Sequence, residues 1–155
     1  MSLSSLHIRE FEPADALPVS NLIRLTMRVS NGADYPLAVL EPLMEYFSPS
    51  NVTRLSQERF CLVAIQDRAI VGTIALEEQT VVTFFVHPDI QGGGIGSRLL
   101  EALESEALKR GIRNLQVESS VTGVAFYEKR GFRATGKRKD GTAGMQTILA
   151  KTLTG

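Results

Sequence analysis

The sequence predicts an α+β fold, in which a mixed, mostly antiparallel central sheet of about six to seven strands carries helices on both faces. Three apolar segments, residues 60–66, 69–76 and 80–87, follow one another with short connections, which is the spacing of an antiparallel meander. A long amphipathic helix at residues 94–110 then leads to a further strand at residues 114–118. A strand–helix–strand connection of this kind is a right-handed parallel crossover, so the predicted sheet is mixed.

The N-terminal part of the chain is expected to contain a strand and a helix. Residues 6–11 alternate weakly between polar and apolar side chains, which indicates a first strand. Pro13 is typical of the first turn of a helix, and apolar residues recur at helical spacing after it. We expect this helix to run to about Val29 and to end at the Ser-Asn-Gly sequence of residues 30–32.

Prolines and glycines predict the remaining boundaries. A less regular helical region covers residues 36–57, and we expect Pro42 and Pro49 to break it. Residues 121–130 form a short helix that Gly131 ends. The chain is expected to close with an antiparallel pair of strands at residues 133–135 and 145–153.

Length and composition exclude several classes of protein. The 155 residues suit one domain, residues 1–155, with one sizeable core. Seventeen basic and seventeen acidic residues cancel, so no overall field indicates nucleic acid or an anionic membrane as a partner. No apolar run reaches the length of a membrane span. The single cysteine, Cys61, excludes an internal disulfide and fits a reducing cytoplasm, and the sparse Cys and His residues predict no metal site.

The most informative segment is the glycine run that precedes the long helix. A β-branched and aromatic strand leads through a Pro-Asp break into Gln-Gly-Gly-Gly-Ile-Gly, residues 91–96. Glycines let a ligand approach backbone N–H groups closely, and the helix dipole favours negative charge there. Residues 91–97 contain no carboxylate, and Arg98 is the first charged residue. The helix start is therefore predicted to bind an external anion such as a phosphate; the alternative is a structural loop before an ordinary helix.

Two common nucleotide-binding loops do not fit this run. A P-loop requires Lys and Ser/Thr directly after its last glycine, whereas Ser97 and Arg98 follow Gly96 here. The dinucleotide pattern G-x-G-x-x-G counted from Gly92 ends on Ser97 instead of glycine. A nucleoside-triphosphate binder is therefore disfavoured.

Two motifs resemble those of the GCN5-related N-acetyltransferase (GNAT) family. The sequence Val-His-Pro at residues 86–88, followed by the glycine run, is similar to the family's acyl-CoA loop, Q/R-x-x-G-x-G/A. Far along the chain, Ala-Phe-Tyr-Glu-Lys-Arg-Gly-Phe at residues 125–132 resembles the block that closes the cofactor site. The resemblance covers residues 6–153. Ser120 and Gly123 depart from the Asn and Ala that many relatives carry there, which leaves details of cofactor contact open.

The resemblance implies the acyl-CoA N-acyltransferase fold and an acetyl-CoA site. In this arrangement, the pantetheine arm pairs with the backbone of a strand next to a splayed parallel neighbour, and the pyrophosphate meets the N–H groups of the glycine run. The cofactor-binding residues it implies are Phe84, Phe85, Val86, Gln91, Gly92, Gly93, Gly94, Ile95, Gly96, Ser97 and Ser120.

Catalytic roles follow from the chemistry of amide formation. Amine attack on a thioester expels a thiolate, and a phenol can protonate it; Tyr127 lies at the family's position for this acid. Alternation along the strand would turn Glu78, Thr80 and Val82 towards the same face as Phe84. Glu78 is then the nearest carboxylate for a general base, acting through a water; the alternative is an ordinary solvated turn residue.

The sequence therefore predicts a cytoplasmic N-acetyltransferase that moves an acetyl group from acetyl-CoA to a primary amine by direct attack in a ternary complex. The alternative is a non-catalytic acyl-CoA-binding regulatory domain that lacks a base. The acceptor, small molecule or peptide, is not identified, although the balanced charge disfavours a strong polycation. By family analogy, Tyr35 and Tyr46 border its pocket, and exposed edge strands suit a homodimer.

Overall fold

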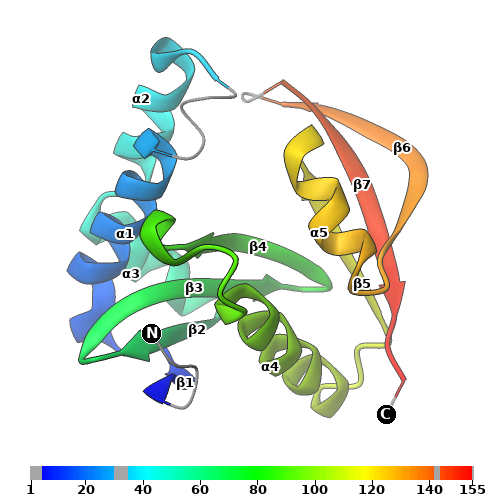
Figure 1. Cartoon of the computed structure of the whole chain (residues 1–155), viewed down its shortest axis with the longest axis horizontal. Coiled ribbons are helices and arrows are strands. Elements are labelled where there is room, and N and C mark those ends of the chain that lie inside the picture. The colour runs from blue at the N-terminus through cyan, green and yellow to red at the C-terminus, as the bar shows by residue number, and fades with distance from the viewer. Residues whose placement is uncertain (1–4, 30–34, 142–143, 155) are drawn as a thin grey trace.

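The computed structural model describes residues 5–29, 35–141 and 144–154, and it contains one sheet of seven strands (Figure 1). Every neighbouring pair is antiparallel except β4 and β5, which run parallel. This arrangement confirms the predicted mixed, mostly antiparallel sheet. In their order across the sheet, the strands are β1 (His7–Glu10), β2 (Phe60–Gln66), β3 (Ala69–Glu77), β4 (Thr80–Val86), β5 (Asn114–Ser119), β7 (Gly144–Thr152) and β6 (Arg133–Gly141).

Helices cover both faces of this sheet. On one side lie α1 (Ala16–Val29), α2 (Leu37–Tyr46) and α3 (Pro49–Glu58), and on the other side lie α4 (Ile95–Lys109) and α5 (Val124–Glu128), as Figure 1 shows. Short 3-10 turns at Pro13–Asp15, Pro88–Ile90 and Val121–Gly123 precede α1, the glycine run and α5. The end predicted for the first helix, residues 30–32, lies outside the described residues.

The prediction that Pro42 breaks the second helical region is wrong. Helix α2 continues through Pro42, which is exposed, while Leu40 is buried and Leu43 packs against the core. Burial of these leucines outweighs the hydrogen bond that proline removes. Pro49 acts as expected, because it occupies the first turn of α3 behind the Ser48 cap.

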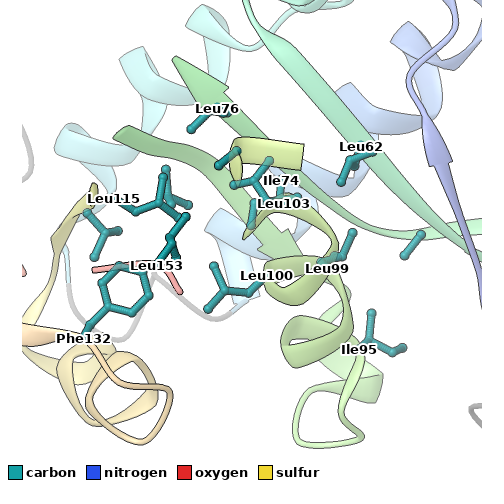
Figure 2. Close-up of a cluster of buried hydrophobic side chains, with 14 of the residues drawn as sticks. Leu62, Ile74, Leu76, Ile95, Leu99, Leu100, Leu103, Leu115, Phe132 and Leu153 are labelled. Atoms are coloured by element: carbon teal, nitrogen blue, oxygen red, sulfur yellow. The ribbon is translucent and has the colours of Figure 1, made fainter. Parts of the chain in front are cut away.

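Two apolar clusters hold the helices to the sheet. The larger one joins α4 to the sheet and to Phe132, which follows α5; Figure 2 shows Leu99, Leu100 and Leu103 among its members. A Cβ on Gly72 of β3 would lie 2.8 Å from the Leu99 Cδ1 atom, so this glycine lets α4 pack closely on the sheet. The second cluster joins α1 and α3 to the opposite face.

A β-bulge in β4 changes which side chains share a face. The register between β3 and β4 shifts between Thr73 and Ala75, and Thr83 has a φ of 49°, in the left-handed region. As a result, Val81 and Phe84 pack on the same cluster although they are three residues apart. The expectation that Val82 faces the same way as Phe84 is therefore wrong, because simple alternation does not pass through the bulge.

No helix among the described residues combines the length and the apolar character that crossing a membrane requires.

Candidate active site

The start of α4 provides a group of backbone donors. Gly94 is its N-cap with a φ of 90°, and Gly92 also has a positive φ of 87°. The first hydrogen bond of the helix runs from the Arg98 N–H to the Gly94 carbonyl at 3.1 Å. The N–H groups of residues 95–97 belong to the first turn, in which a helix offers its own donors no acceptor. Neither a side-chain cap nor an acidic residue occupies this turn. The geometry matches an anion site at a helix N-terminus.

Arg130 adds a positive charge beside this turn. Its Nε donates to the Ser97 Oγ at 2.8 Å, its NH2 group donates to the same oxygen, and NH1 donates to the Phe126 carbonyl at 2.8 Å. The guanidinium carbon also lies 3.7 Å from the centroid of the Phe126 ring. These contacts fix the guanidinium between α5 and the start of α4.

The parallel strands β4 and β5 separate near this helix start. They pair at Thr80 with Gln116 and at Val81 with Val117, the two pairs described between them. Beyond Val81, β4 continues to pair with β3 on its other edge. Backbone groups on the β5 side of β4 thus border a gap, which is the geometry in which an amide-bearing ligand adds to a strand edge. The Gln91 Nε2 donates to the Val86 carbonyl at 2.9 Å, so a side chain of the glycine run reaches one of these groups.

The glycine run, the end of β4 and α5 enclose a cleft that is open to solvent. Its lining includes most residues of the predicted cofactor site together with Gly123, Phe126, Tyr127 and Arg130. The predicted residues that line it are Phe84, Val86, Gln91, Gly92, Gly94, Gly96 and Ser97.

Four predicted cofactor residues lie elsewhere. Gly93 is outside the lining, with its N–H directed to the Ile90 carbonyl at 3.4 Å. The Ile95 side chain is buried in the core, so only the backbone of this first helical residue is left to contact a ligand. Phe85 packs on the α1 side of the sheet, and Ser120 lines a second hollow next to the cleft.

Tyr127 lies between the two hollows and lines both. Its ring makes edge contacts with Phe84, Phe126 and Phe132, with centroid separations of 6.3, 5.2 and 5.5 Å. Burial in this aromatic cluster raises the pKa of the phenol well above its ordinary value. The phenol therefore keeps its proton throughout the neutral range and is suited to donate it.

The second hollow, which is also open to solvent, extends from Tyr127 towards α1 and α2. It shares Phe84, Val86, Gln91, Gly123 and Tyr127 with the first, so the two are continuous. Tyr35 lines it, whereas Tyr46 is exposed and is not among the lining residues. The other lining residues are Thr26, Met27, Leu40, Leu43, Phe85, Glu118, Ser119, Ser120 and Gln146.

Glu78 does not lie with Tyr127. It occupies the turn between β3 and β4 with a φ of 57°, and the strand begins only at Thr80. Its side chain borders another hollow, lined by residues such as Glu10, Arg59 and Arg110. The turn and the bulge at Thr83 together separate Glu78 from the face on which the sequence pattern placed it.

Sequence reasoning missed two charged residues of the site, Glu118 and Arg130. Glu118 is the penultimate residue of β5, and the carboxyl ends of parallel strands meet at one edge of a sheet, so its position at the end of a predicted crossover strand was a usable signal. Arg130 lies inside the block at residues 125–132 that resembles the family's cofactor-site motif, but nothing there indicated its contact with Ser97, 33 residues away in the chain.

Cys61 is half-buried, and burial raises the pKa of its thiol to about 11. The thiol is therefore protonated at neutral pH and is a poor nucleophile. Among the described residues, no group of three or more His, Cys, Asp or Glu side chains is arranged to hold a metal ion.

The fold and the cleft define an acyltransferase-like domain, and comparison with known families agrees. The family model described as an acetyltransferase (GNAT) domain matches residues 33–146. This chain belongs to the GNAT acetyltransferase family, as the two sequence motifs predicted.

Named relatives match over part of their length. An IAA acetyltransferase of Azospirillum brasilense is 39% identical over 84 residues, covering 48% of this chain and 55% of the relative. The [ribosomal protein bS18]-alanine N-acetyltransferase of Escherichia coli K12 is 37% identical over 73 residues, covering 45% and 49%. The peptidyl-lysine N-acetyltransferase YjaB of Salmonella typhimurium is 33% identical over 101 residues, covering 64% and 63%. The matches thus span between about half and just under two thirds of these relatives.

Solved structures share the fold along nearly the whole chain. A GCN5-related N-acetyltransferase from Rhodopseudomonas palustris superposes with a TM-score of 0.84 at 24% identity, covering 99% of both chains. The PaiA N-acetyltransferase of Thermoplasma acidophilum, solved in complex with coenzyme A, superposes with a TM-score of 0.83 at 22% identity, covering 99% of this chain and 100% of that one. At these identities the likeness shows the fold.

Proposed function

We propose that this protein is an N-acetyltransferase that transfers an acetyl group from acetyl-CoA to a primary amine by direct attack in a ternary complex. The observation that carries the proposal is one continuous cleft, in which the glycine-lined start of α4, Arg130 and the protonated Tyr127 converge. Membership of the GNAT family and the coenzyme A complex of the structurally similar PaiA protein support the same substrate.

The described residues fit an acyl-CoA. A Cβ on Gly96 would lie 3.4 Å from the Phe126 ring and 3.5 Å from the Phe84 ring, so any side chain there would pack against two rings that line the cleft. Gly92 and Gly94 both line the cleft with positive φ values, and in this proposal a pyrophosphate accepts from backbone N–H groups at this start of α4. The Arg130 guanidinium adds a positive charge beside these donors. In this proposal, backbone groups of Phe84 and Val86 bind the amide-bearing pantetheine arm of acetyl-CoA. The hydrogen bond from the Gln91 side chain to the Val86 carbonyl is then replaced by one from the cofactor.

Acetyl-CoA supplies the activated acetyl group as a thioester. The amine nitrogen attacks the thioester carbonyl carbon, a C–N bond forms, and the C–S bond breaks to release a thiolate. Tyr127 protonates this thiolate, because its buried phenol retains a proton at neutral pH. The surplus proton of the amine leaves to water, and Tyr127 regains its proton from water. We do not assign Glu78 as the base, since it borders a different hollow.

The proposal also includes a cytoplasmic location and a homodimeric state. A cytoplasmic location agrees with the single half-buried Cys61, which requires no oxidising compartment. A homodimer would use an exposed edge strand, either β1 or β6.

Calorimetric titration with acetyl-CoA, with ATP and NAD as controls, tests the proposal directly. We expect micromolar binding of acetyl-CoA alone, followed by thiol release when a suitable primary amine is added. Binding without transfer to any of a broad panel of amines would instead support the regulatory acyl-CoA-binding domain. Absence of binding by folded protein would show that the glycine run is structural.

A further inference from the structure

We propose that the acceptor is a small primary amine with one positive charge and an apolar body, and that Glu118 binds its ammonium group. This inference rests on the proposed acetyl transfer and concerns the second hollow, which continues from Tyr127. It identifies the class of acceptor that the described side chains recognise.

Glu118 supplies the charge that an ammonium group needs. It is the one carboxylate among the described residues that line the second hollow, and no Lys, Arg or His lines it. It lies at the C-terminal end of β5, where this strand and β4 separate, and its side chain is 29% exposed. A partly buried carboxylate here would draw a cationic amine to the same hollow that Tyr127 borders. The bound ammonium then releases one proton to water, and its neutral nitrogen attacks the thioester carbon.

Lys139 of β6 currently pairs with this carboxylate. Its Nζ lies 3.1 Å from the Glu118 Oε1, and the Lys139 side chain is 62% exposed. An ion pair with one partner this exposed contributes little stability, so a substrate ammonium can replace it at small cost. Lys139 thus occupies the place that we assign to the acceptor's charge.

The side of the hollow facing Glu118 is apolar. Met27 of α1, Leu40 and Leu43 of α2, and Phe85 of β4 line it. Figure 1 shows α1 and α2 on one side of this gap and β5, β7 and α5 on the other. The hydroxyl of Thr26, also on α1, donates to the Leu22 carbonyl at 2.8 Å, so its proton is already bound within the helix. An amine bound at Glu118 therefore directs the rest of its body towards apolar side chains.

This distribution discriminates against polycations. The apolar wall supplies no second carboxylate among its described residues, so a second ammonium placed against it would gain no ionic partner there. An alkyl or aryl group in the same place gains burial instead. The hollow therefore selects a monoamine over a diamine of equal length.

Hexylamine and 1,6-diaminohexane form a matched pair of probes. Both present the same ammonium and methylene chain, and the diamine adds a charge at the far end. We expect kcat/KM for hexylamine to exceed that for the diamine by about 10-fold or more, and to rise about two- to four-fold per methylene from propylamine to hexylamine as the chain is buried. Equal or better use of the diamine would overturn the inference.

Variants test the role of Glu118 separately. Glu118→Gln should raise KM for hexylamine about 10-fold while the Kd of acetyl-CoA is unchanged, and Lys139→Gln should lower KM about two- to five-fold by removing the competing cation. Glu101→Gln, on the exposed side of α4, is the matched control and should change neither quantity. An unchanged KM in Glu118→Gln would refute the assignment.

The same measurements separate this inference from the proposed function. If acetyl-CoA binds and spermidine or a peptide is acetylated while hexylamine is not, the acceptor class is wrong and the acetyl transfer stands. If folded protein does not bind acetyl-CoA, both fail together.

Discussion

Tyr127 combines two properties that a general acid requires, a retained proton and a position at the meeting point of two hollows. Its ring is surrounded by Phe84, Phe126 and Phe132, and this burial raises the pKa of the phenol. A phenol that stays protonated can donate to a thiolate, whereas it is a poor base. We therefore expect no loss of kcat from ionisation of Tyr127 as the pH rises to about 10, the ordinary phenol pKa.

Tyr127→Phe removes the proton and keeps the ring. We expect kcat to fall about 10- to 1000-fold, with the Kd of acetyl-CoA little changed, because the hydroxyl acts on the leaving group and not on binding. Steady-state kinetics combined with calorimetry would measure both quantities. Tyr46→Phe, at an exposed tyrosine outside both hollows, is the control and should leave kcat unaffected. An unaltered kcat in Tyr127→Phe would remove the general-acid role.

We expect the charge of Arg130 to strengthen acetyl-CoA binding, and we expect Arg130 to take no part in the acetyl transfer step. Arg130→Gln should weaken acetyl-CoA binding about five- to 50-fold with kcat at saturation nearly unchanged, since one charge-assisted contact to a phosphate is lost. Lys129→Gln removes the same charge from the neighbouring exposed residue, which does not line the cleft. The two Kd values, measured at low and high salt, check this prediction. Equal losses in both variants would indicate a general field effect in place of a specific contact.

At the scale of elements, the sequence predicted the sheet more fully than the site. Hairpin spacing and helical periodicity identified the strands around the crossover, because these patterns are local. The bulge at Thr83 could not be predicted, since nothing in a β-branched strand marks a residue that adopts a φ of 49°. The predicted placement of Glu78 did not allow for the turn and this bulge, whereas most residues of the glycine run line one cleft because they are consecutive in the chain.

The two ends of α4 allow a prediction about this helix with an internal control. Gly94 and Gly111 flank it with φ values of 90° and 80°, which strain an alanine by about 1–2 kcal/mol. Gly94→Ala and Gly111→Ala should therefore lower Tm to a similar extent. Only Gly94→Ala should weaken acetyl-CoA binding, because Gly94 lines the cleft. Thermal unfolding and calorimetry test this, and equal affinities in the two variants would contradict the loop assignment.

At the scale of the whole molecule, the site exists because the sheet opens between β4 and β5. The opening brings residues of α1, β5 and β7 to one hollow, among them Met27, Glu118 and Gln146. Their separation in sequence explains why no local pattern revealed the acceptor side. This hollow keeps its shape only if α1 stays packed on the sheet. Arg9 of β1 helps to hold the start of α1, because it donates to both carboxylate oxygens of Asp15, at 2.7 and 3.0 Å.

This pair predicts a dependence of stability on pH. The hydrogen bonds from Arg9 hold the pKa of Asp15 below its ordinary value of 3.8, so the folded state binds this proton less readily than the unfolded state does. The stabilising contribution is therefore complete above pH 3.8 and is lost as the pH falls through the lowered pKa. Asp15→Asn should reduce the free energy of unfolding by about 1–3 kcal/mol at pH 7, and the gap to the wild type should narrow as the pH falls below 3.8.

Urea unfolding at a series of pH values measures that gap. Glu12→Gln is the control, because Glu12 lies 3.8 Å from the same Arg9 NH1 atom but is 66% exposed. This variant should cost less than about 1 kcal/mol at any pH, as an exposed ion pair does. A gap for Asp15→Asn that stays constant from neutral pH into the acid range would show that Asp15 stabilises the start of α1 as a neutral hydrogen-bonding group, without the charge that Arg9 supports.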